Sequence, residues 1–356
     1  MARFAFIMHP LSVADVARKY PAAALIPGPI TECLLTLMRP RPVSEITGVR
    51  SLTGATTQGW FVGLYMTAHQ LKTGNPSKAT KRIIEAGKVA QDLGAEIVGL
   101  GAFTSVVGDA GYSVAEALDI GVTTGNSYTV ATALQGSIEA AGLLEHEPAQ
   151  CTAAILGATG SIGRVAAKIL GPQVREIVLN ARSREPLEEL AAELAAEGVN
   201  VRVETDVATA LRDAEITIAV TSAVEAVVQP EMLRPGSVVC DVARPRDVSR
   251  HVAEKRPDVL VIEGGAVAVP GHVEFNLNFG FPPGLSYACM AETMILALEG
   301  RCEDYSLGRD ISIEQVQEIA GLAVKHGFKL AGFRSFERKV SQEYIDRVRA
   351  AAEANR

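Results

Sequence analysis

The sequence predicts an α/β protein built around a doubly wound parallel sheet, and three observations lead to this fold class. Strand-like apolar runs alternate with helix-length segments from about residue 151 to residue 266, the pattern of right-handed βαβ units. A less regular strand–helix region precedes them, and predicted helices follow. With 356 residues, the chain is long enough for about two domains. We expect an N-terminal α/β domain (1–150), a central domain (151–266), and a C-terminal helical segment (267–356) packing back at the cleft.

Composition excludes several classes of protein. Hydrophobic residues make up 48% of the chain and charged residues 21%, which is typical of a globular protein and not of a disordered one. A net charge of −7 gives no overall positive field for a nucleic-acid backbone. The five cysteines contain no CxxC pair, and no metal-ligand spacing is visible. No apolar run is long enough for a signal peptide or a bilayer span, so we expect a cytoplasmic protein.

The N-terminal region contains one clear strand–helix unit. Small and apolar residues form a helical stripe from Ser77 to Leu93, and Glu96–Ala102 then has the composition of a buried strand. A second helix is expected from about Asn126 to Gly142.

In the central region, an apolar strand (Ala153–Leu156) leads into a glycine turn and then a helix that runs to Leu170. The turn has the pattern Gly-x-x-Gly-x-x-Gly, which lets the backbone approach a pyrophosphate while N–H groups and the helix dipole stabilise its charge. This order predicts a Rossmann-type dinucleotide site whose loop residues are Gly157, Ala158, Thr159, Gly160, Ser161, Ile162 and Gly163. Further strands are expected at Glu176–Ala181, Val199–Val203, Glu215–Thr221, Ser237–Val242 and Val259–Ile262, with helices such as Glu185–Glu197 and Asp247–Arg256 between them.

The residues after the second of these strands bear on the choice of cofactor. An NAD site places Asp or Glu there to bind the ribose 2′-hydroxyl, whereas this chain has Arg182, Ser183 and Arg184. Two guanidinium groups and a hydroxyl suit a 2′-phosphate and favour NADPH, although a solvated basic loop is the alternative. Thr221 ends the fourth strand, where small residues let the cofactor cross the sheet edge. Asp241 and Glu263 end the next two strands, either as functional carboxylates or as helix caps and partners of nearby arginines.

Cys289 is the best candidate for a catalytic side chain. Ser286 has the character of an N-cap for a helix running to Glu299, which puts Cys289 in the first turn. There the dipole lowers the pKa of a thiol from about 8.5 and makes the thiolate a nucleophile. A buried cysteine that packs as a small hydrophobe is the alternative, and it is the interpretation that we give to Cys151, Cys240 and Cys302. Two further helices are expected, Ser312–His326 and a surface helix within Arg334–Arg356.

Five motifs occur here in the order seen in the long-chain acyl-ACP reductases, the NADPH-dependent, aldehyde-forming enzymes of cyanobacterial alkane synthesis. They are Val98–Val107, Thr123–Thr129, Gly157–Gly163, Ala288–Glu292 with Leu298–Gly300, and Val324–Phe328. The chain resembles this family over about residues 4 to 330.

The resemblance implies a covalent mechanism. Cys289 would attack the thioester of an acyl-ACP or acyl-CoA, the carrier thiol would leave, and NADPH would deliver a hydride that releases a fatty aldehyde. Asn126 and Thr129 would orient the acyl carbonyl; the alternative is that they cap the following helix, and the two roles are compatible. Five basic residues between Lys72 and Lys88, against one Glu85, would dock an acidic carrier protein or CoA phosphates; the alternative is a solvated helix face.

Two other functions fit part of the pattern. One is an NADP-dependent alcohol or shikimate-type dehydrogenase that needs no covalent step, and the other is a non-catalytic NADP-binding sensor. The role of Cys289 separates the dehydrogenase from the reductase hypothesis, and NADPH oxidation in the presence of acyl thioesters separates the sensor from it.

Overall fold

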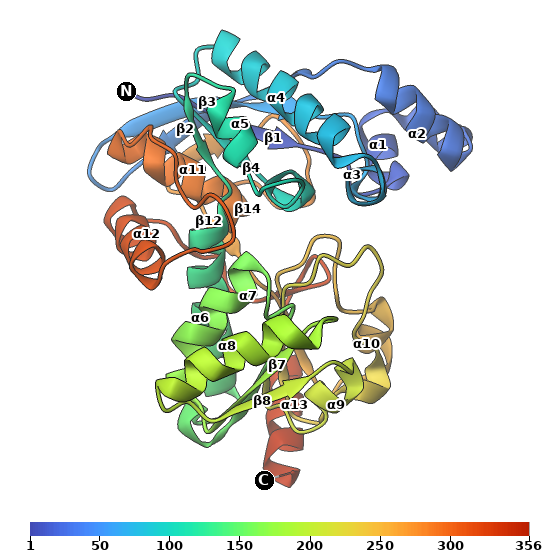
Figure 1. The fold of residues 1–356 in the computed structure, drawn as a ribbon, viewed down its shortest axis with the longest axis vertical. Coiled ribbons are helices and arrows are strands. Elements are labelled where there is room, and N and C mark those ends of the chain that lie inside the picture. The colour runs from blue at the N-terminus through green and yellow to red at the C-terminus, as the bar shows by residue number, and fades with distance from the viewer. Residues whose placement is uncertain (356) are drawn as a thin grey trace. The chain divides into compact units, whose positions relative to one another are not determined.

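The computed structural model describes residues 1–355, apart from the side chains of Arg18 and Lys19, and divides the chain into two compact units. The first unit comprises residues 1–125, 267–308 and 319–329; the second comprises residues 126–266, 309–318 and those from 330 onward. Each unit contains its own six-stranded sheet (Figure 1). Residues of the predicted C-terminal segment therefore contribute to both units.

The sheet of the first unit has the order β13-β2-β3-β1-β4-β5. Its strands are β1 (Phe4–Met8), β2 (Arg41–Arg50), β3 (Thr56–Gly63), β4 (Ile97–Leu100), β5 (Gly121–Thr123) and β13 (Gly271–Glu274). The strands from β3 to β5 are parallel, while β2 and β13 are antiparallel additions at one edge. The predicted strand at 96–102 is thus confirmed as β4, a buried strand between β1 and the edge strand β5.

Helices α4 and α11 both pack on the strands of this sheet. The helices in this part of the chain are α1 (Val13–Lys19), α2 (Gly28–Leu37), α3 (Ala68–Thr73), α4 (Pro76–Asp92), α5 (Tyr112–Glu116) and α11 (Ala288–Glu299), with 3-10 turns η1 (Pro21–Leu25) and η2 (Ala102–Ser105). The predicted helix at 77–93 is α4, which begins because the Asn75 side chain accepts a hydrogen bond from the Lys78 amide (3.2 Å).

The second unit confirms the doubly wound sheet. Six parallel strands have the order β11-β10-β9-β6-β7-β8. They are β6 (Thr152–Leu156), β7 (Glu176–Asn180), β8 (Val201–Glu204), β9 (Ile216–Ala219), β10 (Val238–Asp241) and β11 (Leu260–Glu263). The strand order reverses between β6 and β9, which is where such sheets bind dinucleotides.

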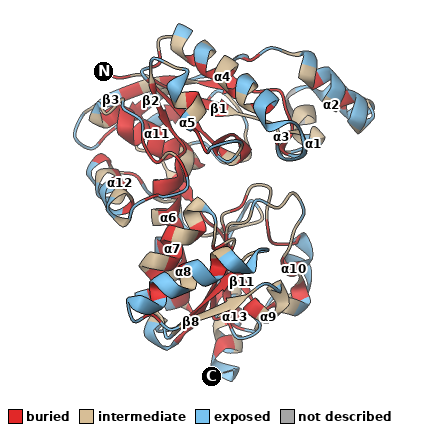
Figure 2. Cartoon of the chain, in the orientation of Figure 1, coloured by how far each residue is buried: buried red, intermediate tan, exposed pale blue. Residues whose placement is uncertain are grey.

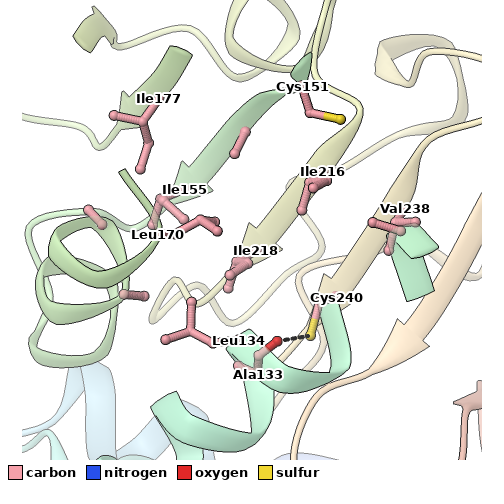
Figure 3. Close-up of a cluster of buried hydrophobic side chains, with 14 of the residues drawn as sticks. Ala133, Leu134, Cys151, Ile155, Leu170, Ile177, Ile216, Ile218, Val238 and Cys240 are labelled. Atoms are coloured by element: carbon pink, nitrogen blue, oxygen red, sulfur yellow. Dashed lines mark hydrogen bonds between the residues drawn. The ribbon is translucent and has the colours of Figure 1, made fainter. Parts of the chain in front are cut away.

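Helices cover both faces of this sheet, so successive strand residues face different helices. Ile155, Ile177 and Ile218 pack against α6 (Asn126–Leu143), α7 (Ser161–Leu170), α8 (Arg184–Ala196) and α13 (Gln342–Ala354), as Figure 3 shows in part. Leu156 and Val178 pack against α9 (Val207–Leu211) and α10 (Arg250–Lys255). Figure 2 shows the resulting contrast between buried strands and the exposed outer side of α8. Strands buried on both faces read as continuous apolar runs, which is why the sequence revealed them.

Two cysteines belong to this core, as predicted. Cys151 and Cys240 are buried, and the Cys240 Sγ lies 3.8 Å from the Ala133 carbonyl oxygen (Figure 3). Burial raises the pKa of the Cys240 thiol to about 12, so it stays protonated and acts as a packing residue.

The end of the chain departs from the prediction of a single surface helix. A hairpin of β16 (Arg334–Ser335) and β17 (Arg338–Lys339) precedes α13, with Phe336 and Glu337 at positive φ in its turn. Val348 of α13 is fully buried, so this helix forms part of the core. Residue 356, included in the predicted helix, lies outside the described residues.

The remaining elements are short, except for α12 (Ile313–His326), which confirms the helix predicted at 312–326. They are β12 (Ala266–Ala268), β14 (Leu285–Tyr287), β15 (Lys329–Leu330), η3 (Pro148–Gln150), η4 (Gly171–Gln173) and η5 (Pro230–Met232). Within residues 1–355, no helix combines the length and apolarity needed to cross a bilayer.

Candidate active site

Cys289 is the second residue of α11, so the prediction that it lies in the first helical turn is confirmed. The expected N-cap was wrong: the helix begins at Ala288, Tyr287 occupies the N-cap position, and Ser286 lies buried in β14. The side chain of Cys289 is half-buried. The amide groups and the dipole at this end of a twelve-residue helix favour a thiolate there.

The turn after β5 contacts the backbone of Cys289 directly. Gly125 has a φ of +74°, and a methyl group placed on it would lie 2.3 Å from both the Cα and the Cβ of Cys289. Both features require glycine, one through backbone conformation and the other through space. The Gly125 amide donates a hydrogen bond to the Thr123 hydroxyl (3.2 Å), which fixes the turn.

A fully buried carboxylate, Glu292, lies one helical turn after Cys289. Its Oε1 accepts hydrogen bonds from the hydroxyls of Thr123 (2.5 Å) and Ser306 (2.7 Å). Thr123 belongs to β5 and lies two residues before Gly125, so these bonds join the turn, the loop after α11 and the first turns of α11. A buried carboxylate bound in this way holds its neighbours in one arrangement.

Sequence reasoning did not single out Gly125, Glu292, Thr123 or Ser306. The signal for Glu292 was present, because it is the only charged residue between Ala288 and Leu298 and follows Cys289 by three positions. Ser306 had no such signal, since its role depends on a loop that returns to β5.

Aromatic side chains extend from the start of α11. The ring of Tyr287 lies 4.6 Å from that of Phe281 and 6.3 Å from that of Phe279, between centroids. Phe279 in turn contacts Phe275 (5.2 Å). A hollow of about 360 Å³ borders these phenylalanines, and its lining also includes the polar residues Glu274, Asn276 and Asn278. Cys289 therefore lies in the first turn of a helix whose N-cap residue, Tyr287, belongs to a cluster of aromatic rings.

In the second unit, the predicted glycine loop connects β6 to α7. Gly157 has a φ of +84°, and a Cβ on Gly163 would lie 2.3 Å from the Gly157 carbonyl oxygen, so the tight turn needs both glycines. The amides of Gly157 and Ala158 donate to the Asn180 carbonyl (2.8 and 3.0 Å) and shape the loop. Gly160 is the N-cap, and Ser161 and Ile162 open α7, where N–H groups point out of the helix end. The loop thus fits a pyrophosphate at the helix N-terminus.

The end of β7 carries no acid. Asn180 is buried and its side-chain amide donates to the Glu204 carbonyl (2.9 Å). Arg182, Ser183 and Arg184 follow it on the surface, and Arg184 makes only an exposed pair with Glu188 at 3.4 Å. Such a pair is weak, so the guanidinium groups are available to a phosphate.

Thr221 is held at the end of β9 by Asp247, whose carboxylate accepts its amide (2.7 Å) and its hydroxyl (2.5 Å). Asp241 accepts the amides of Asp247 (3.3 Å) and Val248 (3.1 Å), and burial raises its pKa to about 7. Glu263 pairs with Arg246 at 2.6 Å. Asp241 therefore holds the following loop and Glu263 is the partner of an arginine, as the alternative for these two acids expects.

Asn126 and Thr129 lie in the second unit, whereas Cys289 lies in the first. Asn126 is the first residue of α6, and its amide group donates to the Ser161 hydroxyl (3.2 Å) beside the glycine loop. Thr129 is buried in the next turn, and its carbonyl accepts the Thr132 hydroxyl (3.1 Å).

Cys302 follows α11 and is half-buried, like Cys289, but burial and two neighbouring glutamates raise the pKa of its thiol. Cys33 is exposed on α2. Among the described residues, no group of three or more His, Cys, Asp and Glu side chains is arranged to hold a metal ion.

The basic run from Lys72 to Lys88 falls on two helices. Lys72 lies on α3, while Lys78, Lys81 and Lys88 are exposed along α4. Arg82 is engaged instead with Glu85 (2.8 Å) and with the Met38 carbonyl. A hollow of about 430 Å³ borders Lys81, Thr80 and the loop at Gly108.

Residues 140–263 match the family model described as shikimate / quinate 5-dehydrogenase, and all of them belong to the second unit. The chain is 32% identical over 355 residues to aminotransferase PigE of Serratia sp.. This alignment covers 96% of the chain but only 41% of PigE. It is 30% identical over 306 residues to long-chain acyl-[acyl-carrier-protein] reductase of Synechococcus elongatus, covering 82% of the chain and 87% of that protein. The structure of shikimate 5-dehydrogenase from Listeria monocytogenes aligns with 90% of the chain over 96% of its own length, at 10% identity and a TM-score of 0.38.

Proposed function

The chain belongs to the family of long-chain acyl-[acyl-carrier-protein] reductase, a family of oxidoreductases, and from that premise we propose that it reduces an acyl thioester to an aldehyde through a covalent intermediate on Cys289. The observation that carries the proposal is the start of α11. Cys289 lies in the first turn, Gly125 contacts its backbone, and the buried Glu292 joins both through hydroxyl groups.

In the first step the Cys289 sulfur attacks the thioester carbon. A new C–S bond forms, the bond to the carrier sulfur breaks, and the carrier leaves as a thiolate that takes a proton from water. The helix N-terminus favours the attacking thiolate, and the Gly125 turn keeps its backbone in place. Glu292 is a positioning residue, because its carboxylate contacts Thr123 and Ser306, which carry no reacting atom.

The residues of the second unit fit a nicotinamide cofactor, and we propose NADPH. Gly157–Gly163 and the start of α7 would hold the pyrophosphate, Arg182 and Arg184 the 2′-phosphate, and Thr221 would border the cofactor at the sheet edge. Bound there, NADPH would supply the hydride, and Cys289 would leave the acyl carbon as the thiolate when the aldehyde is released.

Two features support an acyl carrier as the donor. The aromatic surface around Phe279 and Tyr287 suits an acyl chain, and the exposed lysines of α3 and α4 suit an acidic carrier or CoA phosphates.

The double variant Lys78→Glu/Lys81→Glu should raise the KM for an acyl-carrier protein at least tenfold and leave unchanged the KM for the same acyl group on uncharged N-acetylcysteamine. Equal effects on both substrates would contradict carrier docking.

Replacement of Cys289 by Ser tests the proposal. We expect loss of thioester-dependent NADPH oxidation and loss of a covalent acyl adduct, because the hydroxyl is a far weaker nucleophile at this position. Cys302→Ser is the matched control, since Cys302 is also half-buried and follows the same helix; it should keep both.

The dehydrogenase alternative rests on the match of residues 140–263, which contains neither Cys289 nor Glu292. It predicts that Cys289→Ser retains turnover with an alcohol or keto substrate. A non-catalytic sensor predicts that NADPH binds and no thioester of any chain length accelerates its oxidation. The chain spans only 41% of PigE, so the aminotransferase name of that longer protein does not define the activity of this chain.

A further inference from the structure

The segment from Pro21 to Met38 forms η1 and α2, and its exposed side chains are uncharged and mostly apolar. Leu25 is 88% exposed, Leu37 75%, Ile30 52% and Leu34 48%. Ile30, Leu34 and Leu37 recur at helical spacing and so form one stripe along α2. We call these four residues the α2 patch; α2 appears as the dark blue helix in Figure 1, with its exposed side pale blue in Figure 2.

Another side of α2 is buried in the fold. Thr31 and Leu35 are buried against the first unit. Glu32, the only charged residue of the segment, accepts the Thr67 hydroxyl on its carboxylate (2.8 Å) and the Gln70 amide on its backbone carbonyl (3.1 Å). These contacts anchor one side of the helix to the fold, while the stripe of Ile30, Leu34 and Leu37 remains in contact with solvent. Contiguous exposed apolar residues of this kind mark a binding surface.

Arginines surround the end of α2. Arg39 follows the helix and is exposed, and Arg82 donates to the Met38 carbonyl. Arg41 donates to the hydroxyls of Tyr20 and Tyr65, both at 2.9 Å. Residues 10–88 contain ten basic and four acidic side chains, although acids outnumber bases by 41 to 34 in the whole chain. The apolar patch thus lies in the basic part of an acidic protein.

We propose that the α2 patch and the exposed Arg39 and Arg41 beside it bind the surface of a bilayer that contains anionic lipids. Leucine and isoleucine side chains enter the acyl boundary without needing hydrogen-bond partners, while arginine and tyrosine suit the headgroup level. Basic residues next to an inserted apolar stripe add attraction to negatively charged headgroups. This surface is independent of the thiol site and of the lysines on α4.

Charge argues against a second copy of the chain as the occupant. A symmetric dimer through α2 would bring the exposed Arg39 of one chain toward Arg39 of the other, and like charges repel. An anionic surface has the opposite sign and imposes no such cost.

Co-sedimentation of the full chain with vesicles tests the proposal. The protein should pellet with vesicles of phosphatidylcholine and phosphatidylglycerol, at least about tenfold less with phosphatidylcholine alone, and less as salt rises from 50 to 500 mM. The variant Leu34→Ser/Leu37→Ser should reduce the bound fraction at least about tenfold. Arg39→Glu should abolish the preference for phosphatidylglycerol.

Leu52→Ser and Val324→Ser are matched controls, because Leu52 and Val324 are 75% and 76% exposed outside the patch; both should bind vesicles like the unchanged protein. The proposal is overturned if the unchanged protein stays in the supernatant with both vesicle types, or if the α2 and control variants bind equally. A dimer in solution that Leu34→Ser/Leu37→Ser converts to monomer would also overturn it. Unfolding midpoints within about 2 °C of one another would show that the variants are folded.

Discussion

Gly125→Ala is the substitution that most directly perturbs the geometry around the thiol. The new Cβ would lie 2.3 Å from the Cα and Cβ of Cys289, whereas carbon atoms in contact lie about 3.5 to 4.0 Å apart. The turn or the start of α11 must therefore move by about 1.2 Å or more. Misplacement of a reacting group by about 1 Å costs about 100-fold in rate, so we expect a loss of that order in kcat.

Gly300→Ala provides the control for backbone strain. Gly300 ends the same helix with a φ of +73°, close to the +74° of Gly125, but no atom lies within 4 Å of a Cβ placed there. Each variant should lose about 1 to 3 kcal/mol of unfolding free energy from the left-handed backbone, and only Gly125→Ala should also displace Cys289.

The assay is thioester-dependent NADPH oxidation, with activity normalised to the fraction folded in urea titrations. Gly300→Ala should keep kcat within about twofold, because its strain lies at the far end of α11. If Gly125→Ala has the same kcat as Gly300→Ala, the contact between the turn and Cys289 does not position the thiol, and the reasoning is wrong.

Three further predictions concern buried and surface charges. Glu292→Ala removes the acceptor of two buried hydroxyls and should lower the unfolding free energy by about 3 kcal/mol, and Glu292→Gln by less than half of that; equal losses in urea titrations would refute the network. Arg182→Ala/Arg184→Ala should raise the KM for NADPH about 10- to 100-fold and leave the KM for NADH unchanged, so parallel changes in both would refute binding of the 2′-phosphate. Burial raises the pKa of Asp241 to about 7, so the folded state holds this proton more tightly than the unfolded chain does. The free energy of unfolding should therefore fall as the pH rises from about 4 to about 7. Asp241→Asn should make this pH-dependent decrease in unfolding free energy smaller by up to about 4 kcal/mol, as measured by urea unfolding at each pH. An unchanged dependence of the unfolding free energy on pH would contradict the raised pKa.

The sequence predicts best where one local pattern determines the structure. The strands of the second unit are buried on both faces, so their apolar runs were visible, and each begins within about two residues of its expected position. The glycine loop and the position of Cys289 in the first turn of α11 were also local features.

Long-range contacts explain what the sequence did not predict. The N-cap is Tyr287 and not Ser286 because β14, which pairs with β12 about 20 residues away, continues through Tyr287 before α11 begins. The role of Ser306 depends on a loop that returns to Thr123, 183 positions earlier. The hairpin before α13 places Phe336 in a turn, although its spacing to Val340 suggested one continuous helix.

Mass spectrometry of the protein incubated with an acyl thioester in the absence of NADPH tests the central claim most directly. The account predicts an increase by the mass of one acyl group on the peptide that contains Cys289, which disappears when NADPH is added and never forms in Cys289→Ser. An enzyme that turns over the thioester with no adduct on Cys289, or with an adduct on Cys302 instead, would contradict covalent catalysis at the start of α11.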